Sequence, residues 1–510
     1  MKRLLLFPIL LFVSLLDGQS AVAQDTNEPR LSLVIRGRTN IIKQGDEIPI
    51  EFVISNQGTQ VFNYEVHLAD QAGLTPGFKL LVKTTAGDEL PDIRVADNLI
   101  RHARSRAVGF SGLHAGEAVT NIVTLNRRAL VREPGHYEIV GSSRSDDNLG
   151  KIIGPLRSAP IVITVLPRTK EEMDAYIKDL TDQIEARFPI QRTAYGAPFD
   201  PVLEGLLVKL MFTCDAAIVP TMLRMIYDPG INGNPNQGIE ALLYYVPHTE
   251  ESKKAILQAA VKQGLSENMY DLLSHYEVNK EELKPIIERA LAQDNLYECH
   301  FGATLAANPT NYDEAFTPRL IVLACGTTND HWVRREAMRA LACNRTDGGV
   351  KALKSMLNDA DPDTGASLAA AICDGYSTKL DKRLHPEDFD ANDVRPLTER
   401  LLKSGTNRFY GFSLAALFGD DTLTPTLVAT ATGGRHPDDL EAIYALAMNR
   451  TDEGVTTLKT LLNGKDELIS KVTANAIDNG YKWRGAARGK PLRPDDFDAK
   501  FQHPETSPPK

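Results

Sequence analysis

Residues 340–347 read ALACNRTD and residues 445–452 read ALAMNRTD, so seven of eight positions are identical at a distance of 105 residues. In both copies a Gly-Val pair follows, and then a Leu-Lys pair, at the same spacing. A segment that returns at a fixed distance is typical of stacked structural repeats rather than of one closed core. These two segments therefore decide the fold expected for the C-terminal half.

Shorter segments repeat at similar distances. The matching sets are Asp374-Gly375-Tyr376 with Asn479-Gly480-Tyr481, residues 386–390 (PEDFD) with 494–498 (PDDFD), Thr317-Pro318 with Thr424-Pro425 and more weakly with Val219-Pro220, and the steps Glu240-Ala241, Glu336-Ala337 and Glu441-Ala442. They predict three modules of roughly 100 residues each, at about 204–290, 291–395 and 396–498, of which the first is divergent.

Inside a module the apolar residues recur with a helical period. We expect one helix over 333–341, a partner over 350–357 with Thr346 as its cap, and another helix over 366–372 after a turn at 359–362. One pair of helices cannot bury its own apolar face, whereas stacked pairs share a continuous core. The sequence therefore predicts an all-α, armadillo-like solenoid over 204–498.

An acidic turn that contains proline, at Asp359–Pro362, and the pattern Val333-Arg334-x-x-Ala-x-x-Ala-Leu resemble the HEAT-repeat family. In that family the Asp and Arg of the pattern bridge neighbouring repeats, so the resemblance implies a structural role for Arg334. The corresponding residues 438–442 read DDLEA and lack the Val-Arg pair.

The N-terminal region has a different period, because apolar and polar residues alternate there as they do in half-buried strands. Residues 48–54 and 62–68 lie on either side of Asn56-Gln57-Gly58 and predict a hairpin. The other expected strands are 31–35, 78–82, 118–125, 137–140 and 161–165. Seven short strands predict two packed antiparallel sheets, an all-β sandwich over 28–167, followed by a linker helix at 168–203.

Two segments of this β region resemble immunoglobulin-like and fibronectin type III-like modules. Residues 134–139 (PGHYEI) form a turn into a penultimate strand with a tyrosine near its start, and residues 158–167 form a closing strand. The cysteine pair and core tryptophan of antibody domains are absent. The resemblance implies a sandwich and no particular ligand.

The first residues have the three parts of a signal peptide. Lys2 and Arg3 precede an apolar run over 4–16, and Ala21-Val22-Ala23 provides the small residues that a signal peptidase requires. A membrane-spanning helix needs about 20 apolar residues, whereas this run has 13 and contains Pro8. We therefore expect residues 1–23 to be removed and the protein to be exported, to the periplasm or the extracellular medium, without a membrane span.

The net charge of −10 is unevenly distributed. Residues 24–167 carry 16 basic and 16 acidic side chains, whereas residues 168–510 carry a net charge of −11. An acidic helical region repels phosphates, which argues against nucleic acid and anionic lipid as partners. The densest basic cluster, Arg101-His102-x-Arg104-x-Arg106, is expected to be a solvated loop, and the alternative is a patch for an acidic partner.

The sequence contains no His-Glu-x-x-His, Cys-x-x-Cys or Gly-x-Ser-x-Gly motif. Residues 485–490 (GAARGK) superficially resemble a phosphate-binding loop, but the segment is one residue short and Pro491 follows it. Cys299-His300 has no second pair of ligands nearby and is expected to lie in an apolar helix over 296–305. We therefore assign no catalytic, cofactor-binding or metal residues and expect no cofactor.

Three other features have structural explanations. Asp388, Asp390, Asp495, Asp496 and Asp498 are expected in solvated acidic turns plugged by Phe389 and Phe497, with a calcium site as the alternative. The sequons that begin at Asn344 and Asn449 fall in the repeated turn between helices. Five cysteines, an odd number at irregular spacing, are expected to be free thiols buried on helix faces: Cys214, Cys299, Cys325, Cys343 and Cys373.

This organisation predicts an exported, non-enzymatic scaffold for protein–protein interaction, ending in a disordered tail at 499–510. A protein partner is expected, and its identity and the oligomeric state stay open. The alternative is an exported enzyme or enzyme inhibitor whose site lies in the irregular loops at 84–111.

Overall fold

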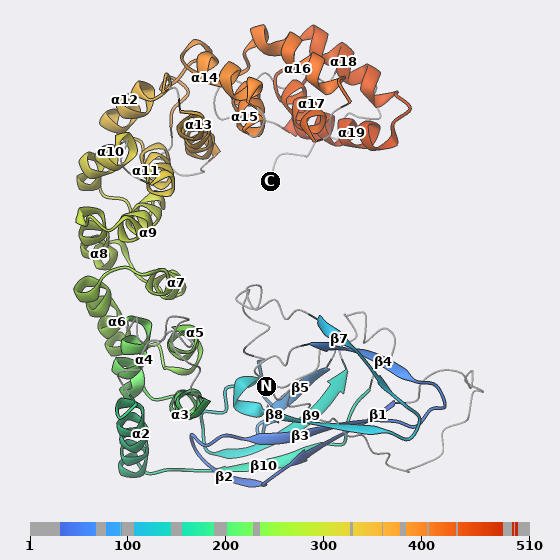
Figure 1. Cartoon of the computed structure of the whole chain (residues 1–510), viewed down its shortest axis with the longest axis vertical. Helices are drawn as coiled ribbons and strands as arrows, with labels where there is room; N and C mark the ends of the chain where they lie inside the picture. Colours follow the sequence, from blue (N-terminus) through green and yellow to red (C-terminus); the bar gives the residue numbers. More distant parts are fainter. Residues whose placement is uncertain are drawn as a thin grey trace, which may run out of the picture. The chain divides into compact units, whose positions relative to one another are not determined.

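The structure is a computed structural model. It describes residues 31–67, 78–91, 93, 107–143, 156–187, 201–227, 235–326, 330–359, 361–377, 384–404, 407–434, 437–482, 492–493 and 495–497. The chain divides into two compact units, Met1–Ile256 and Leu257–Lys510. The described strands all lie in the first unit, and the second is helical, so the predicted order of a β region followed by an α region is confirmed (Figure 1).

The described strands form three hydrogen-bonded groups. The first, in the order β1-β3-β8, is antiparallel and consists of β1 (Leu31–Gly37), β3 (Pro49–Asn56) and β8 (Ala118–Thr124). The second, in the order β2-β10-β9-β5-β6, consists of β2 (Ile41–Lys43), β10 (Ile161–Leu166), β9 (Gly135–Ser143), β5 (Phe78–Thr84) and β6 (Glu89–Leu90). The third pairs β4 (Phe62–His67) with β7 (Ala107–Leu113). Since β6 and the first five residues of β7 lie within 84–111, that segment is less irregular than expected.

The expected hairpin between residues 48–54 and 62–68 is wrong. Strand β3 pairs with β1 and β8, and β4 pairs with β7 instead. The Asn56 side chain accepts a bond from the Gly58 amide at 2.9 Å and donates one to the Leu113 carbonyl at 2.9 Å. The turn is thereby tied to the end of β7, and the chain leaves the first sheet. An alternating pattern of apolar residues specifies which face of a strand is buried, but it does not determine which other strand pairs with it.

The expectation of purely antiparallel pairing is also wrong at one place, because β2 and β10 run parallel. Strands β1 and β2 are adjacent in the chain, yet they belong to different sheets. At Gly37, where the chain leaves β1, an added Cβ would come within 2.7 Å of Ile163 Cδ1. Side chains from both sheets, including Ile35, Phe52 and Ile139, form one buried core.

The first unit also contains helices. Their bounds are α2 (Lys170–Glu185), α3 (Pro201–Phe212), α4 (Val219–Tyr227), α5 (Pro235–Glu240), the π-helical turn η4 (Ala241–Tyr245) and α6 (Glu250–Gln263), within which the two units divide. Arg132 donates to the carbonyls of Tyr244 and Tyr245 at 3.0 and 3.2 Å, and the Tyr245 hydroxyl donates to Asn126 O at 3.0 Å. The predicted boundary at 167 therefore marks a change from strand to helix inside one compact unit.

The second unit arranges its helices in two rows. After α7 (Glu267–His275), the even row contains α8 (Lys280–Ala292), α10 (Thr317–Cys325), α12 (Asp347–Ser355), α14 (Ala391–Lys403), α16 (Thr424–Ala431) and α18 (Asp452–Leu462). The odd row contains α9 (Leu296–Ala307), α11 (His331–Cys343), α13 (Pro362–Ser377), α15 (Arg408–Phe418), α17 (Asp438–Met448) and α19 (Glu467–Lys482). Each odd-row helix packs against the next one in its row and against even-row neighbours (Figure 1).

The repeat found in the sequence is also a repeat of contacts. The Thr346 hydroxyl caps α12 by accepting the Gly349 amide at 3.1 Å, and Thr451 caps α18 through Gly454 at the same distance. At Gly375 an added Cβ would lie 2.7 Å from the Ala342 carbonyl oxygen, and at Gly480 it would lie 2.6 Å from that of Ala447. These glycines recur because each lets two odd-row helices approach at backbone distance.

The prediction for the segments that close the two modules, residues 386–390 and 494–498, is correct in part. Phe389 and Phe497 are buried, as expected of plugs. Asp388 and Asp496 are buried as well, so the expectation of solvated turns is wrong for them. Arg345 bonds both oxygens of Asp388 at 3.0 and 2.8 Å, and Arg450 bonds those of Asp496 at the same distances. An arginine therefore occupies two of the five carboxylates, Asp388 and Asp496, that the calcium alternative would have used.

Helices α8 and α14 are a further repeated pair, which the sequence analysis missed. Both begin with a capping box and contain a basic residue followed by proline. The equivalent residues are Asn279 and Asp390, Glu282 and Asp393, Lys284-Pro285 and Arg395-Pro396, and Glu288-Arg289 and Glu399-Arg400. The predicted module boundaries 203/204, 290/291 and 395/396 fall within α3, α8 and α14. The helices indicate that the two similar modules begin at Asn279 and Asp390.

An aspartate before each of three helices recurs in all three predicted modules. Asp215, Asp313 and Asp420 accept the amide two residues later, at 2.8 to 3.0 Å, and cap a 3-10 turn before α4, α10 and α16. These helices begin at Val219, Thr317 and Thr424. The weak match of Val219-Pro220 to the two Thr-Pro pairs is thereby confirmed as a structural equivalence.

Asp313 leads to a prediction about pH. The Ala315 amide and the Lys284 ammonium, which lies 3.0 Å away, lower the pKa of Asp313 to about 2. A lowered pKa contributes stability above the ordinary value of about 4, and the contribution is lost as the pH falls through the folded pKa. Asp313→Asn keeps a capping oxygen and removes the charge. It should be less stable than wild type by about 0.5–1 kcal/mol at pH 7, and the difference should vanish between pH 4 and pH 2, as measured by urea unfolding. A constant difference would contradict the assignment.

Candidate protein-binding edge

Several predictions about chemistry can be compared with the structure. Among the described residues, no three His, Cys, Asp or Glu side chains gather closely enough to hold a metal ion. None of the described helices is long and apolar enough to cross a bilayer. Asn344 and Asn449 are almost completely buried, so the sequon side chains are inaccessible in the folded chain. The predicted leader 1–23, the basic cluster 101–106, the segment 485–490 and the tail 499–510 lie outside the described residues.

The five cysteines are free, as predicted. Their expected burial on helix faces is correct for Cys299 and Cys343, whereas Cys325 is exposed at the end of α10 and Cys214 lies in a loop after α3. Burial raises the pKa of Cys214 and Cys343 to about 11. The thiolate is the reactive form, so these two thiols are poor nucleophiles at neutral pH.

The feature that the sequence analysis missed is a row of exposed apolar side chains. Tyr297, Trp332, Phe409 and Leu468 are 77%, 51%, 53% and 53% exposed. Each is the second residue of an odd-row helix, namely α9, α11, α15 and α19. We call the first turns of the six odd-row helices the N-terminal edge. Single exposed apolar residues are ordinary on a protein surface, whereas four at one structural position need an explanation.

Each of these side chains follows a short polar residue that starts its helix. Asn295 accepts the Tyr297 amide at 3.0 Å, Asp330 accepts the Trp332 amide at 2.9 Å, and Asp466 accepts the Ile469 amide at 3.1 Å. An Asn or Asp cap fixes the first turn of a helix. The second residue of the helix then lies beyond the end of the interface between packed helices. The pattern Asn/Asp-x-apolar at 295, 330, 407 and 466 was the available signal.

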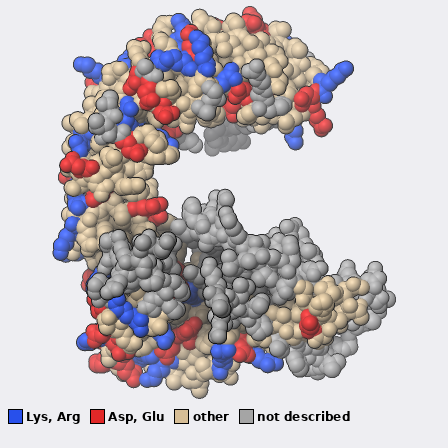
Figure 2. Space-filling view, viewed as in Figure 1, with Lys and Arg blue, Asp and Glu red and all other residues tan. Residues whose placement is uncertain are grey.

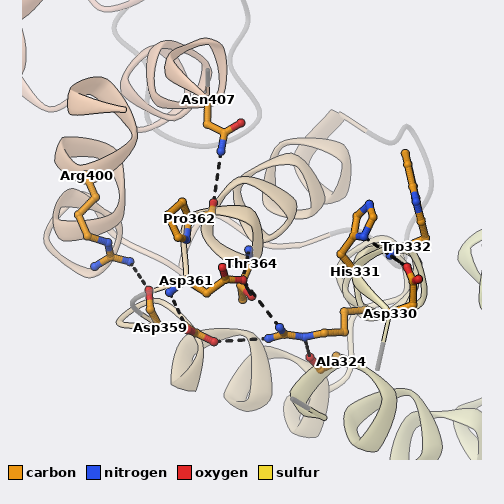
Figure 3. A network of polar contacts seen from close by, with 11 residues as sticks. Ala324, Asp330, His331, Trp332, Asp359, Asp361, Pro362, Thr364, Arg400 and Asn407 are labelled. Atoms are coloured by element: carbon orange, nitrogen blue, oxygen red, sulfur yellow. Dashed lines mark hydrogen bonds and ion pairs between the residues drawn. The ribbon is translucent and has the colours of Figure 1, made fainter. Parts of the chain in front are cut away.

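Polar contacts hold consecutive helix ends together along this edge (Figure 3). From α11, Arg334 donates to Asp359 Oδ2 at 3.4 Å, and its other amino group lies 3.9 Å from Asp361 Oδ2, just before α13. Asn407, the residue before α15, donates to the Pro362 carbonyl at 3.5 Å. Arg408 then pairs with Asp438 of α17. The N-termini of these four helices therefore lie side by side.

Two further arginine contacts secure the turn before α13. Arg334 Nε donates to the Ala324 carbonyl at 3.2 Å, and Arg400 donates to the Leu357 and Asp359 carbonyls at 2.8 and 3.0 Å (Figure 3). The Thr364 hydroxyl and amide both bond Asp361 and lower the pKa of its carboxyl. Arg334 thus joins α11 to the end of α10 and to the turn before α13.

The edge is acidic as well as apolar. The residue before each of the six helices and the first three residues within it together supply eight carboxylates and one guanidinium. Asp363 and Glu467 are exposed among them. Acidic residues favour helix N-termini because of the helix dipole, and parallel helices collect them on one side. On the face of the helices that Figure 2 draws, Lys and Arg are interspersed with Asp and Glu.

Trp332 is oriented by its own helix. The Arg335 guanidinium carbon lies 5.3 Å from the centre of the indole ring, and the His331 ring lies 4.6 Å away between centroids. The indole therefore lies beside two polar side chains of its own helix while about half of it stays accessible. A rigid, half-exposed tryptophan loses little conformational freedom on binding and is a favoured anchor in protein interfaces.

Comparisons with known proteins do not identify a family. No protein-family model matches the chain, and no curated protein matches it. Among solved structures, the chain is similar to human deoxyhypusine hydroxylase in complex with glycerol, at 12% sequence identity over 52% of this chain and 96% of that chain, with a TM-score of 0.19. A likeness at this score carries no argument about the fold or function of this chain.

Proposed function

We propose that this protein is an exported, non-enzymatic scaffold that binds another protein along the N-terminal edge of its helical unit. The observation that carries the proposal is the equivalent position of Tyr297, Trp332, Phe409 and Leu468, all more than half exposed. Aromatic side chains at a rigid surface are the residues that supply most of the binding energy in protein interfaces. The polar contacts that join the N-termini of α11, α13, α15 and α17 keep Trp332 and Phe409 at defined positions, which reduces the entropy cost of binding.

The proposal includes the two family resemblances. For the helical unit, the contact of Arg334 with the acidic turn at 359–361 supports a HEAT-like solenoid. For the β region, the Tyr137 hydroxyl donates to the Glu133 carbonyl at 2.6 Å, near the start of the penultimate strand. A tyrosine that bonds the backbone a few residues upstream at this corner is a feature of immunoglobulin-like sandwiches. Export rests on the leader pattern in residues 1–23.

Affinity capture with matched variants tests the proposal. The protein, a variant with Tyr297→Ser, Trp332→Ser and Phe409→Ser, and a control with Val261→Ser and Val322→Ser are used to capture partners from an extract of the native cell envelope. The control residues are 39% and 54% exposed and lie on α6 and α10, away from the edge. Wild type and control should retain a partner. The affinity of the edge variant for that partner should be at least about tenfold lower, which corresponds to about 1.4 kcal/mol. Retention of every partner by the edge variant would refute the proposal.

The alternative of an enzyme or inhibitor with a site at 84–111 stays open. Residues 92 and 94–106 of that segment lie outside the described residues. No contact among the described residues of this segment favours the alternative over the edge.

A further inference from the structure

We propose that the partner contacts the N-terminal edge through a cationic segment that also carries apolar side chains. The inference rests on the proposed function and adds the chemistry of the partner. It follows from three properties of the edge, which are its net charge, the occupancy of its backbone amides and the spacing of its aromatic side chains.

The net charge of the edge is negative even after the helix dipoles are included. Eight carboxylates and one guanidinium leave seven negative charges on the first turns of the six helices. Each helix N-terminus contributes about half a positive charge, so six contribute about three. Arg334 and Arg289, which pair with Asp361 and Glu298, add two positive charges, so about two negative charges remain. The unit that contains the edge, residues 257–510, is itself acidic, with 30 basic and 37 acidic side chains and a net charge of −7. A cationic segment is attracted to this surface and an anionic one is repelled.

At four of the six helices, a side chain already occupies one of the free amides that make a helix N-terminus an anion site. Asn295, Asp330, Asp361 and Asp466 each accept an amide in the first turn of their helix. An anionic ligand would have to displace these caps, and each displacement costs about 1 kcal/mol. The caps therefore add to the net charge in excluding an acidic partner.

The aromatic side chains supply apolar contacts and faces for cations. Packed helices lie about 8–10 Å apart, so Trp332 on α11 and Phe409 on α15, with α13 between them, are separated by about 20 Å. An extended chain covers that distance with about six residues. Exposed Asp363 lies on the intervening helix. A segment with an apolar residue at each end and lysine or arginine between them matches this order of groups.

Synthetic peptides test the inference on the full chain. The probes are the 12-residue peptides KKLSKKSKLSKK, EELSEESELSEE and KKGSKKSKGSKK, in which the two leucines or glycines lie six residues apart, measured by calorimetry at 50 and 300 mM NaCl. The chain contains two tryptophans, Trp332 and Trp483, so in a Trp483→Phe background the fluorescence of Trp332 reports binding at the edge. We expect the Lys-Leu peptide to bind at least tenfold more tightly than the other two and to weaken at the higher salt.

Two variants separate the charge from the apolar contacts. Asp363→Asn with Glu467→Gln keeps the aromatic side chains and should weaken the Lys-Leu peptide about threefold to tenfold, with a smaller salt dependence. Val322→Ser should change nothing. Equal binding of the Glu-Leu peptide, or unchanged affinity in the charge variant, would overturn the inference. If the captured partner is lost in the edge variant but is unaffected by the charge variant, the scaffold proposal stands and the cationic segment is refuted. If the partner survives in the edge variant, the scaffold proposal itself fails.

Discussion

Leu341→Ala and Leu446→Ala should each lower the free energy of unfolding of the helical unit by about 2–5 kcal/mol, the range for a fully buried leucine. Leu341 and Leu446 are 0% and 1% exposed and occupy the same place in the two modules. The Cβ of an alanine replacing Gly349 would lie 3.4 Å from Leu341 Cδ2, and one replacing Gly454 would lie 3.3 Å from Leu446 Cδ2. Each truncation leaves a cavity between an odd-row helix and the even-row helix that follows it.

Calorimetry on each variant should show one early transition. Stacked helices contact mainly their neighbours, so the damage should remain in the second unit, and the transition of the strand-containing unit should not move. Leu468→Ala on α19 is the matched control, because this leucine is 53% exposed and should lose less than about 0.5 kcal/mol. Unchanged melting of both buried-leucine variants would mean that the module equivalence is incorrect.

Arg450→Met should cost about 3 kcal/mol, because it leaves Asp496 as a buried charge without its arginine. The guanidinium makes three bonds to this carboxylate, at 2.7, 2.8 and 3.0 Å, and the Asp496 side chain is 5% exposed. In the other module Arg345 bonds Asp388 through Nε and lies 3.3 Å from the exposed Asp347. Arg345→Met should therefore show the same effect at a somewhat smaller size.

A double-mutant cycle separates the pair from other effects of the substitution. Asp496→Asn removes the buried charge, so Arg450→Met in that background should cost less than it does in wild type. Arg38→Met is the control, because its pair with Glu51 is exposed and should contribute at most about 1 kcal/mol. Additive costs at positions 450 and 496 would show that the ion pair does not stabilise the module.

The same pair should depend on pH. Burial alone raises the pKa of Asp496, but bonds from Arg450 and from the Arg493 amide outweigh it and hold the pKa below its ordinary value. The contribution is therefore present above about pH 4 and is lost as the pH falls through the folded pKa. The coupling measured in the cycle should follow this course.

The repeat itself could be predicted from the sequence because it is a local and periodic property. Residues 340–347 and 445–452 each contain the end of one helix, a cap and the start of the next, and the same local chemistry produces the same turn twice. The change from strands to helices after Leu166 could be predicted for a similar reason, since periods of two and of 3.6 are read over a few residues. The capping role of Thr346 follows from its position alone.

The pairing of the strands and the burial of charged side chains could not be predicted in this way. Alternation over 48–54 and 62–68 indicates buried faces, but the partners of β3 and β4 are decided by contacts distant in sequence, such as the bond from Asn56 to Leu113. Asp388 and Asp496 appear to belong to solvated turns until Arg345 and Arg450, more than 40 residues away, are brought against them.

The sequence by itself determined the helix caps, the acidic first turns and the apolar residue after them at 297, 332, 409 and 468, because each depends on residues within one helical turn. Only the tertiary structure decided that these turns form one edge. Stacking aligns six helices in one direction, and contacts such as Arg334 with Asp359 and Arg408 with Asp438 join the N-termini of four of them. The candidate binding surface therefore arises from packing, since no single segment of the chain contains it.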